Sequence, residues 1–258
     1  MKIKFKMIFK IIAYLLLVIA FEAHSQTISE EKSFDVYLLI GQSNMSGRGV
    51  LDPKNNTIQE NILMLDKDNN WVIAKDPLHF DKSIAGVGPG ISFAKSMLKG
   101  HKKSKIGLIP CAWGGSPIKV WKSGAEYLDH FPYDEAIARV KIAIQKGGIL
   151  KSILWHQGES DNDTEKAKIY LDKLKELIAD LRRDLNAPNL PFVAGEIGRF
   201  NKKDIINEII NKLPAEVANT AVVSSKNLKD RGDHVHFNTL SAQKLGKRYA
   251  KAMKKLQK

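Results

Sequence analysis

Three residues that together suit hydrolysis by a serine nucleophile stand far apart in the chain. Ser43 lies in the segment GQSNM at 41–45, and Asp233 and His236 lie three residues apart near the C-terminus. A serine hydroxyl must lose its proton to a base, and a carboxylate can hold that base in the required tautomer. We therefore predict that Ser43 is the nucleophile, His236 the general base and Asp233 the residue that orients it.

The tetrahedral intermediate of such a reaction also needs hydrogen-bond donors for its oxyanion. Ser43 follows an apolar run at a predicted strand-to-helix turn, where backbone N–H groups face incoming negative charge. Gly115 has no side chain to block a substrate, so its N–H is a candidate donor, and Gln157 is a candidate amide donor. Each such donor contributes about 3–4 kcal/mol to catalysis.

Taken singly, none of these signals is specific. A serine after a strand is most often a helix cap, and paired glycines most often form a turn. Their joint placement is more informative, because ligands of open α/β sheets bind beyond the carboxyl ends of the strands. Polar segments follow all five predicted strands, at 41–45, 111–116, 156–161, 196–199 and 233–236.

Short apolar runs alternate with helical patterns and predict the elements that position these segments. The runs are Val36–Ile40, Ile106–Pro110, Ser152–His156, Phe192–Glu196 and Ala221–Ser225. Helical periodicity extends over Tyr133–Lys146, Thr164–Leu185 and Leu240–Leu256. Alternation of this kind predicts an α/β fold with a central parallel sheet of about five strands and helices on both faces.

The segment from Gly47 to Gly90 interrupts the alternation. It is rich in Asn, Asp, Gly and Pro, and its only apolar runs are short, at Ile62–Leu65 and Trp71–Ala74. We expect a long excursion between the first two core strands that contains a small hairpin. Long loops in compact domains are usually functional, so this excursion is a candidate wall of the active site.

The first 25 residues have the pattern of a secretory signal peptide. Four lysines precede an apolar run at Ile11–Phe21, and Ala23-His24-Ser25 supplies small residues for cleavage. The run has about half of the roughly 20 residues that a transmembrane helix needs. We expect a signal peptide over 1–25 and one esterase domain over 26–258. We also expect export to the periplasm or the medium, without stable membrane insertion after cleavage. An uncleaved membrane anchor is the alternative.

The basic composition does not indicate a nucleic-acid partner. The formal net charge is +13, part of which belongs to the signal segment, and many of the remaining lysines are scattered along helices such as Lys244–Lys258. Neither a basic patch interleaved with aromatic residues nor a nucleic-acid-binding module is recognisable. The single cysteine, Cys111, cannot form an intramolecular disulfide, and we expect it to be a buried small residue rather than a nucleophile.

Five blocks of the chain match, in order, the motifs of a known superfamily. They are Ile40–Gly49, Gly88–Ala94, Gly114–Ile118 with Trp121, Trp155–Asp161 and Asp233–Phe237. These blocks resemble those of the SGNH hydrolases, specifically the branch of carbohydrate esterase family 6 and the sialate O-acetylesterases. The resemblance extends over nearly the whole chain after the signal segment. It implies a three-layer α/β/α, flavodoxin-like fold and the removal of acetyl groups from carbohydrate, through chemistry that needs neither a cofactor nor a metal.

The resemblance also implies roles for individual residues. It assigns Ser43, His236 and Asp233 to the catalytic triad. It assigns the oxyanion donors to the Ser43 N–H, the Gly115 N–H and the side chain of Gln157, a position at which many SGNH enzymes have asparagine. Because the sequence does not determine the turn, the N–H of Gly114 is an alternative to that of Gly115.

Four further residues near these blocks are candidates for substrate binding or support: Gln42, Arg48, Glu159 and Arg199. Glu159 could be the acid of the triad, but it is distant in sequence from His236. We therefore expect Glu159 to brace the Gln157 loop through hydrogen bonds. The two arginines could contact substrate, anchor a loop or lie in solvent.

Other functions are compatible with parts of the pattern. Asp233-His234-Val235-His236 could hold a metal, as in metal-dependent deacetylases, since histidines at i and i+2 of an extended segment face the same way; this leaves Ser43 and the glycine blocks unexplained. A carbohydrate-binding protein without catalysis would not need the full set of Ser, Asp and His. A lipase or thioesterase of the same superfamily would need a larger acyl pocket. The expected substrate is an acetylated oligo- or polysaccharide such as acetylxylan, with O-acetylated sialic acid as the alternative, and the oligomeric state stays open.

Overall fold

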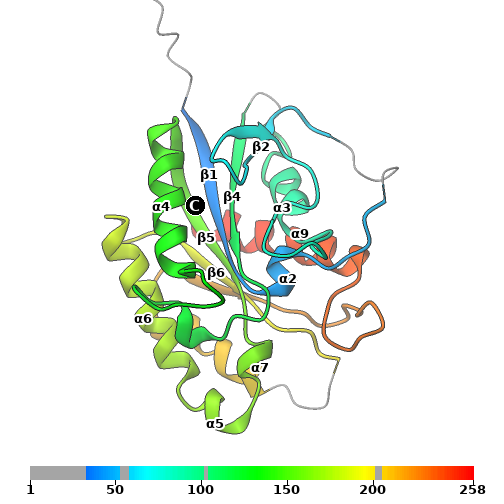
Figure 1. Cartoon of the computed structure of the whole chain (residues 1–258), viewed down its shortest axis with the longest axis vertical. Coiled ribbons are helices and arrows are strands. Elements are labelled where there is room, and N and C mark those ends of the chain that lie inside the picture. The colour runs from blue at the N-terminus through cyan, green and yellow to red at the C-terminus, as the bar shows by residue number, and fades with distance from the viewer. Residues whose placement is uncertain (1–32, 53–57, 102–103, 201–204) are drawn as a thin grey trace, which may run out of the picture. The chain divides into compact units, whose positions relative to one another are not determined.

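A seven-stranded sheet runs through the part of the chain from Phe34 to Lys258 (Figure 1). The structure is a computed structural model that describes residues 33–52, 58–101, 104–200 and 205–258. The predicted signal peptide lies outside these residues. Within the described ranges, no helix is both long enough and apolar enough to cross a membrane.

The five predicted runs correspond to five neighbouring parallel strands. They are β1 (Phe34–Gly41), β4 (Ile106–Ala112), β5 (Gly148–His156), β6 (Phe192–Gly195) and β7 (Thr220–Val223). Their order in the sheet is β4-β1-β5-β6-β7. All seven residues of β4 are buried, a pattern typical of parallel strands that are covered on both faces.

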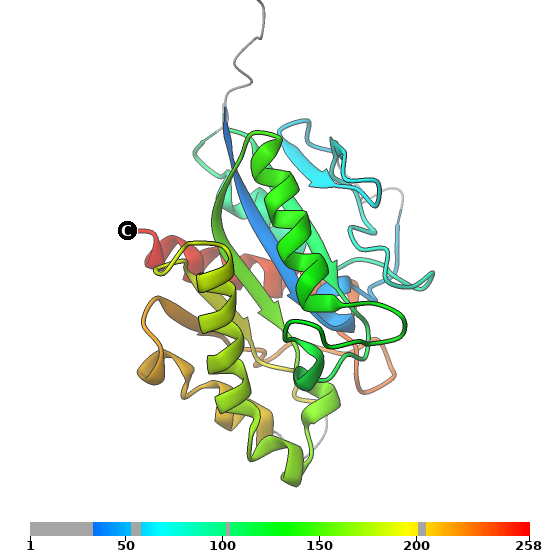
Figure 2. The same ribbon diagram turned by 60° about the vertical axis from the view of Figure 1, so that its left-hand side comes forward.

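Helices cover the two faces of this sheet and complete three layers. On one face lie α4 (Pro132–Gln145) and α6 (Tyr170–Asp184), whose buried residues share a core cluster with Val36, Leu38 and Ile40. On the other lie α3 (Gly90–Met97) and α9 (Thr239–Leu256), whose buried residues share a second cluster with Tyr37 and Leu39. This division follows from the alternation of side chains along a strand. Figure 2 shows α4 and α6 in front of the sheet and α9, in red, behind it.

The excursion contains the expected hairpin, and the hairpin joins the central sheet. Strands β2 (Ile62–Leu65) and β3 (Trp71–Ile73) pair with each other in antiparallel fashion, and β2 pairs in parallel with β4. The sheet therefore has seven strands where the apolar runs predict about five. The short edge strand β3 leaves Val72 and Ile73 exposed, which explains why its pattern is weak.

The predicted helix over 164–185 is divided in two. The short helix α5 (Thr164–Ala167) begins where the Asp163 side chain accepts hydrogen bonds from the N–H groups of Glu165 and Lys166, and α6 begins at Tyr170. Ile169 lies between the two helices and is 53% exposed. Two shorter helices, α7 (Ile205–Ile210) and α8 (Leu213–Glu216), lie between β6 and β7.

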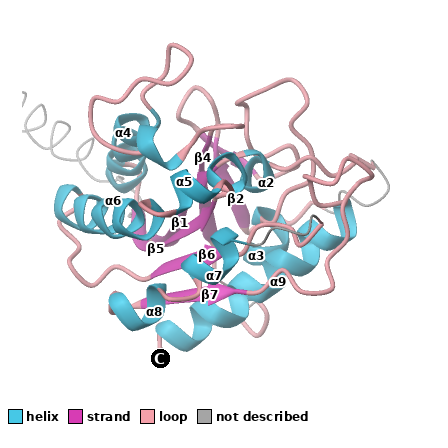
Figure 3. Ribbon diagram, turned by 90° about the horizontal axis from the view of Figure 1, so that it is seen from below, coloured by secondary structure: helices cyan, strands magenta, loops and turns pink. Residues whose placement is uncertain are grey.

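The register of the strands brings the polar segments to one end of the sheet. Gly41 at the end of β1 lies opposite Ala112 of β4 and His156 of β5, so all three strands end together. Gly41 has a φ of +128°, and a Cβ there would lie 2.1 Å from the His156 carbonyl oxygen. Glycine is therefore required for β1 to turn into the four-residue helix α2 (Ser43–Ser46). Figure 3 views this end of the sheet, with α2, α5 and α7 near it.

Candidate active site

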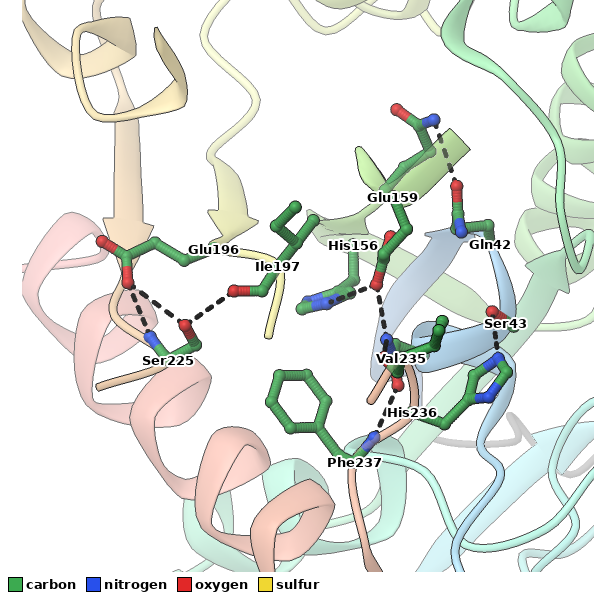
Figure 4. Close-up of polar contacts among 12 residues, drawn as sticks. Gln42, Ser43, His156, Glu159, Glu196, Ile197, Ser225, Val235, His236 and Phe237 are labelled. Carbon is green, nitrogen blue, oxygen red and sulfur yellow. Dashed lines mark hydrogen bonds and ion pairs between the residues drawn. The ribbon is translucent and has the colours of Figure 1, made fainter. Parts of the chain in front are cut away.

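Ser43, His236 and Asp233 form one chain of hydrogen bonds, although 193 positions separate Ser43 from His236. The Nε2 atom of His236 lies 3.0 Å from Ser43 Oγ (Figure 4). The Nδ1 atom of the same ring lies 2.7 Å from Asp233 Oδ2. Ser43 is buried, with 6% of its surface exposed. The structure thus brings together the three residues that the sequence predicts as nucleophile, base and orienter.

Asp233 is held as a carboxylate. Partial burial opposes its charge, but hydrogen bonds from the His236 N–H, the His236 ring and the Val235 N–H outweigh this effect and lower the pKa of Asp233 to about 2. An ionised Asp233 accepts the proton on Nδ1 of His236. Nε2 is then the acceptor that faces the Ser43 hydroxyl.

Asn44 connects the loop that carries His236 (the histidine loop) to the turn that carries Ser43, a role that the sequence did not indicate. Its Nδ2 atom donates to the Val235 carbonyl oxygen at 3.0 Å, and its Oδ1 atom accepts from the Phe237 N–H at 3.0 Å. Because Asn44 adjoins Ser43 and these partners flank His236, the Ser43 and His236 side chains are held next to each other. The position next to the nucleophile was the only sequence signal for this role.

Glu159 contacts Asn44 and not His236. Its Oε1 atom accepts from Asn44 Nδ2 at 2.5 Å and lies 3.7 Å from Nε2 of His156 (Figure 4). Burial opposes the charge of Glu159, but the contacts with His156 and Asn44 outweigh it and lower its pKa. In turn, the Tyr249 hydroxyl donates to the Trp155 carbonyl oxygen at 2.7 Å and lies 3.1 Å from His156 Nδ1. Glu159 therefore has the geometry of a brace for Asn44 and, through it, for the histidine loop.

The two glycines after β4 differ in what their N–H groups contact. The Gly114 N–H donates to Asp81 Oδ2 at 2.9 Å. The N–H groups of Gly115 and Ser43 have no hydrogen-bond partner among the described residues. Gly115 has a φ of +86°, a conformation that favours glycine. Of the two glycines, only Gly115 has an N–H that is available to a ligand.

Gln157 is fully buried and faces protein acceptors. Its Nε2 atom lies within 3.2 Å of three oxygens: Gln42 Oε1, the Ser116 carbonyl oxygen and Asp161 Oδ2. The amide has only two hydrogens for these three acceptors. Gln42, also buried, accepts a further contact from the Ser160 N–H at 3.4 Å. Gln157 and Gln42 thus join the segments that follow β1, β4 and β5.

The two candidate arginines are held by carboxylates. Arg48 is 3% exposed, and its guanidinium contacts Asp81 Oδ2 at 3.1 Å, so it has the geometry of a loop anchor. Arg199 makes a two-pronged contact with Glu196, at 2.8 and 3.1 Å. Burial opposes the charge of Glu196, but hydrogen bonds from Arg199 and from neighbouring polar groups outweigh it and lower the pKa of Glu196 to about 2. Figure 4 shows Glu196 apart from Ser43 and His236.

The two histidines of the 233–237 segment diverge. His236 faces Ser43, whereas His234 has a φ of +57°, is 73% exposed at its side chain and lies 3.4 Å from Asp230. The extended geometry on which the metal interpretation depends is therefore not present at these residues. No group of three or more His, Cys, Asp or Glu side chains suited to a metal occurs in the described part of the chain. Cys111 is buried, and burial raises the pKa of its thiol to about 11, which is unfavourable for a nucleophile.

Residues 33–255 match the protein family described as "Carbohydrate esterase, sialic acid-specific acetylesterase". The match covers nearly all of the chain that the structure describes. The chain belongs to this family. A "Probable carbohydrate esterase" of Arabidopsis thaliana is 34% identical over 238 residues, which cover 84% of this chain and 89% of the relative.

Solved structures agree with this placement. The crystal structure of an Arabidopsis thaliana protein is similar with a TM-score of 0.78 and 33% identity, and covers 87% of this chain and 99% of that one. NanS has a TM-score of 0.69 at 16% identity, over 87% of this chain and 97% of that one. A carbohydrate acetylesterase from Xanthomonas citri has a TM-score of 0.66 at 21% identity, over 84% and 55%. The latter two support the three-layer α/β fold. As a member of the family, this chain is a carbohydrate acetylesterase and thus a carboxylic ester hydrolase.

Proposed function

We propose that this carbohydrate acetylesterase acts through a Ser43-His236-Asp233 triad and an acetyl-enzyme intermediate. The observation that carries the proposal is the continuous hydrogen-bonded chain from Ser43 Oγ through the His236 ring to Asp233. His236 Nε2 takes the serine proton while Ser43 Oγ attacks the acetyl carbonyl carbon. Collapse of the tetrahedral intermediate breaks the bond to the sugar oxygen, which leaves as a hydroxyl with the proton from His236.

A second half-reaction releases the acetyl group. A water molecule loses a proton to His236 Nε2 and attacks the carbonyl carbon of acetyl-Ser43. The bond to Ser43 Oγ breaks, Oγ regains the proton from His236, and acetic acid leaves and ionises to acetate in solution. Asp233 stays ionised throughout, since its role is to orient the imidazole and to stabilise its charged form.

The oxyanion of both intermediates is proposed to bind the N–H groups of Ser43 and Gly115. The availability of the Gly115 N–H, and the use of the Gly114 N–H by Asp81, favour Gly115 over Gly114. Gln157 could donate directly only if its Nε2 gave up a protein acceptor. We therefore propose that its main contribution is to fix the Ser116 carbonyl, and hence the turn that carries Gly115.

The proposed substrate is an acetylated oligo- or polysaccharide, with O-acetylated sialic acid as the second candidate because the family description names it. Acetate release from acetylated xylan, other acetylated glycans and O-acetylated sialic acid would identify the substrate, with Ser43→Ala as the control. We expect p-nitrophenyl acetate to be cleaved faster than the butyrate and octanoate esters. Preference for the long acyl chains would contradict the acetylesterase proposal in favour of a lipase or thioesterase.

Activity is expected to rise with pH from the acid side, because only the neutral ring of His236 can accept the serine proton. The pKa of Asp233 is lowered to about 2, so this carboxylate stays ionised above about pH 4 and does not contribute to the rise of activity above that pH. A profile of kcat/KM from pH 4 to 9 measures this rise. An activity maximum below about pH 5 would contradict His236 as the base.

Chelators are expected to leave turnover unchanged, because the proposed chemistry uses only the side chains and N–H groups of the chain. The measurement is the rate of p-nitrophenyl acetate hydrolysis before and after dialysis against EDTA. Loss of activity on dialysis, with recovery on addition of zinc, would instead favour a metal-dependent deacetylase that uses the 233–236 segment.

A further inference from the structure

Asp81, which the sequence did not indicate, lies between α2 and the turn that contains Gly114 and Gly115. It comes from the excursion, between β3 and α3. Its Oδ1 atom accepts a hydrogen bond from the Ser46 hydroxyl in α2, and its Oδ2 atom accepts from the Gly114 N–H at 2.9 Å. One carboxylate therefore connects the helix that begins at Ser43 to the turn that carries Gly115.

Asp81 is buried as an ion pair with Arg48. The two side chains are 1% and 2% exposed, and Arg48 Nη2 lies 3.1 Å from Asp81 Oδ2. Burial opposes the charge of Asp81, but the hydrogen bond from Ser46 and the charge of Arg48 outweigh it and lower its pKa. A buried carboxylate with several donors around it is ionised and held in one orientation.

The same cluster reaches the histidine loop. Arg48 Nη1 donates to the Ser46 hydroxyl at 2.9 Å and to the Gly47 carbonyl oxygen at 2.7 Å. The carbonyl oxygen of Arg48 accepts from Arg231 Nη1 at 2.9 Å. Arg231 belongs to the loop that carries His236, and its N–H donates to the His236 carbonyl oxygen at 2.9 Å. The Asp81–Arg48 pair therefore contacts segments that carry the nucleophile, the base and the proposed oxyanion donor.

Gly114 permits this arrangement through close approach. A Cβ at this position would lie 2.5 Å from Arg48 Nη2 and 2.7 Å from Asp81 Oδ2, so any side chain would push the ion pair away. The Gly114 N–H is directed into the pair, whereas the next N–H along the turn, that of Gly115, has no hydrogen-bond partner among the described residues. The carboxylate thus engages one of the two glycines and leaves the other to a ligand.

We propose that Asp81 is a positioning residue that sets the placement of the Gly115 N–H relative to Ser43 Oγ. The inference rests on the proposed function, since it presupposes Ser43 as nucleophile and Gly115 as oxyanion donor. The Asp81 side chain is 1% exposed and is bonded to Ser46, Arg48 and Gly114, not to Ser43 or His236. Its effect on the reaction is through geometry, and small misplacements of catalytic groups are costly, at up to about a hundredfold in rate for 1 Å.

The test is Asp81→Asn, which keeps the shape of the side chain and removes its charge. We expect kcat for p-nitrophenyl acetate to fall by about ten- to a hundredfold while KM changes little, because the donors are needed in the transition state more than for binding. A matched control is Asp134→Asn. Asp134 likewise accepts from a serine hydroxyl and a glycine N–H, those of Ser123 and Gly124 at 2.9 and 2.8 Å, and is expected to keep kcat within twofold.

Titration with a p-nitrophenyl phosphonate ester separates positioning from misfolding. The burst amplitude counts folded active sites, and the rate constant reports the attack of Ser43 on a centre whose oxygen needs the same donors. Asp81→Asn is expected to give the wild-type amplitude with a slower rate constant. Full amplitude with a wild-type rate constant and kcat would overturn the proposal.

A milder variant covers the case in which Asp81→Asn does not fold. Ser46→Ala removes only the hydroxyl that bonds Asp81 from α2, and we expect a two- to tenfold lower kcat with unchanged KM. An unchanged kcat in folded Ser46→Ala, together with a low burst amplitude for Asp81→Asn, would show a purely structural role and overturn the proposal. If mass spectrometry finds no phosphonate on Ser43 of the wild type, the proposed function itself is wrong.

Discussion

Replacement of Ser43 by alanine is expected to lower the turnover of p-nitrophenyl acetate by about 10⁴- to 10⁶-fold, the range found when the nucleophile of a serine triad is removed. The change deletes the atom that forms the acetyl ester. It should alter stability little, because the only hydrogen bond that Ser43 Oγ makes among the described residues is with His236 Nε2. Activity would be measured together with the melting temperature.

Ser96→Ala is a suitable control for this substitution. Ser96 also lies in a helix, but its hydroxyl donates to the Ser92 carbonyl oxygen on α3, outside the triad. We expect Ser96→Ala to retain turnover within a few-fold of the wild type. Full turnover in Ser43→Ala would place the nucleophile elsewhere in the chain.

Asp233→Asn is expected to lower kcat by about 10⁴-fold with little change in stability. An asparagine oxygen could still accept from the N–H groups of Val235 and His236, so the loop would keep its backbone contacts. The amide would instead present a donor or a neutral acceptor to His236 Nδ1 and disturb the tautomer in which Nε2 accepts the serine proton. The measurement is kcat for p-nitrophenyl acetate at pH 8.

Asp230→Asn tests whether that loss is specific. Asp230 lies on the same loop and accepts from the His234 N–H at 2.7 Å, but it does not touch His236. We expect its kcat to stay within about tenfold of the wild type. Equal losses in the two variants would indicate that both act through loop folding, and near-normal turnover in Asp233→Asn would point to another orienter.

The central strands were predictable because their burial leaves a continuous apolar pattern. The residues of β1 and β4 are almost all buried, and each run stands out from its polar surroundings. The hairpin was harder to place, since β2 and β3 are short and β3 is half exposed. Whether such a hairpin joins the sheet is decided by its packing on β4 and α3, which the local sequence does not specify.

The meeting of Ser43 with Asp233 and His236 could be predicted because these residue types have few other reasons to follow two strands of one sheet, here β1 and β7. The residues that support them could not be predicted in the same way. Asp81 and Tyr249 act through contacts with backbone groups that are distant in sequence, and a backbone acceptor or donor leaves no mark in the residue types. Arg48 and Glu159 were recognised as candidates, but only their burial and partners distinguish support from substrate contact.

The proposed acetyl-enzyme can be sought directly. Wild-type protein mixed with p-nitrophenyl acetate would be quenched in acid at short times and digested, and its peptides examined by mass spectrometry. We expect one acetyl group on the peptide that contains Ser43, formed no more slowly than acetate is released, and none in Ser43→Ala. Steady acetate release by the wild type with no acetyl group on Ser43, and undiminished release by Ser43→Ala, would contradict the acetyl-enzyme mechanism.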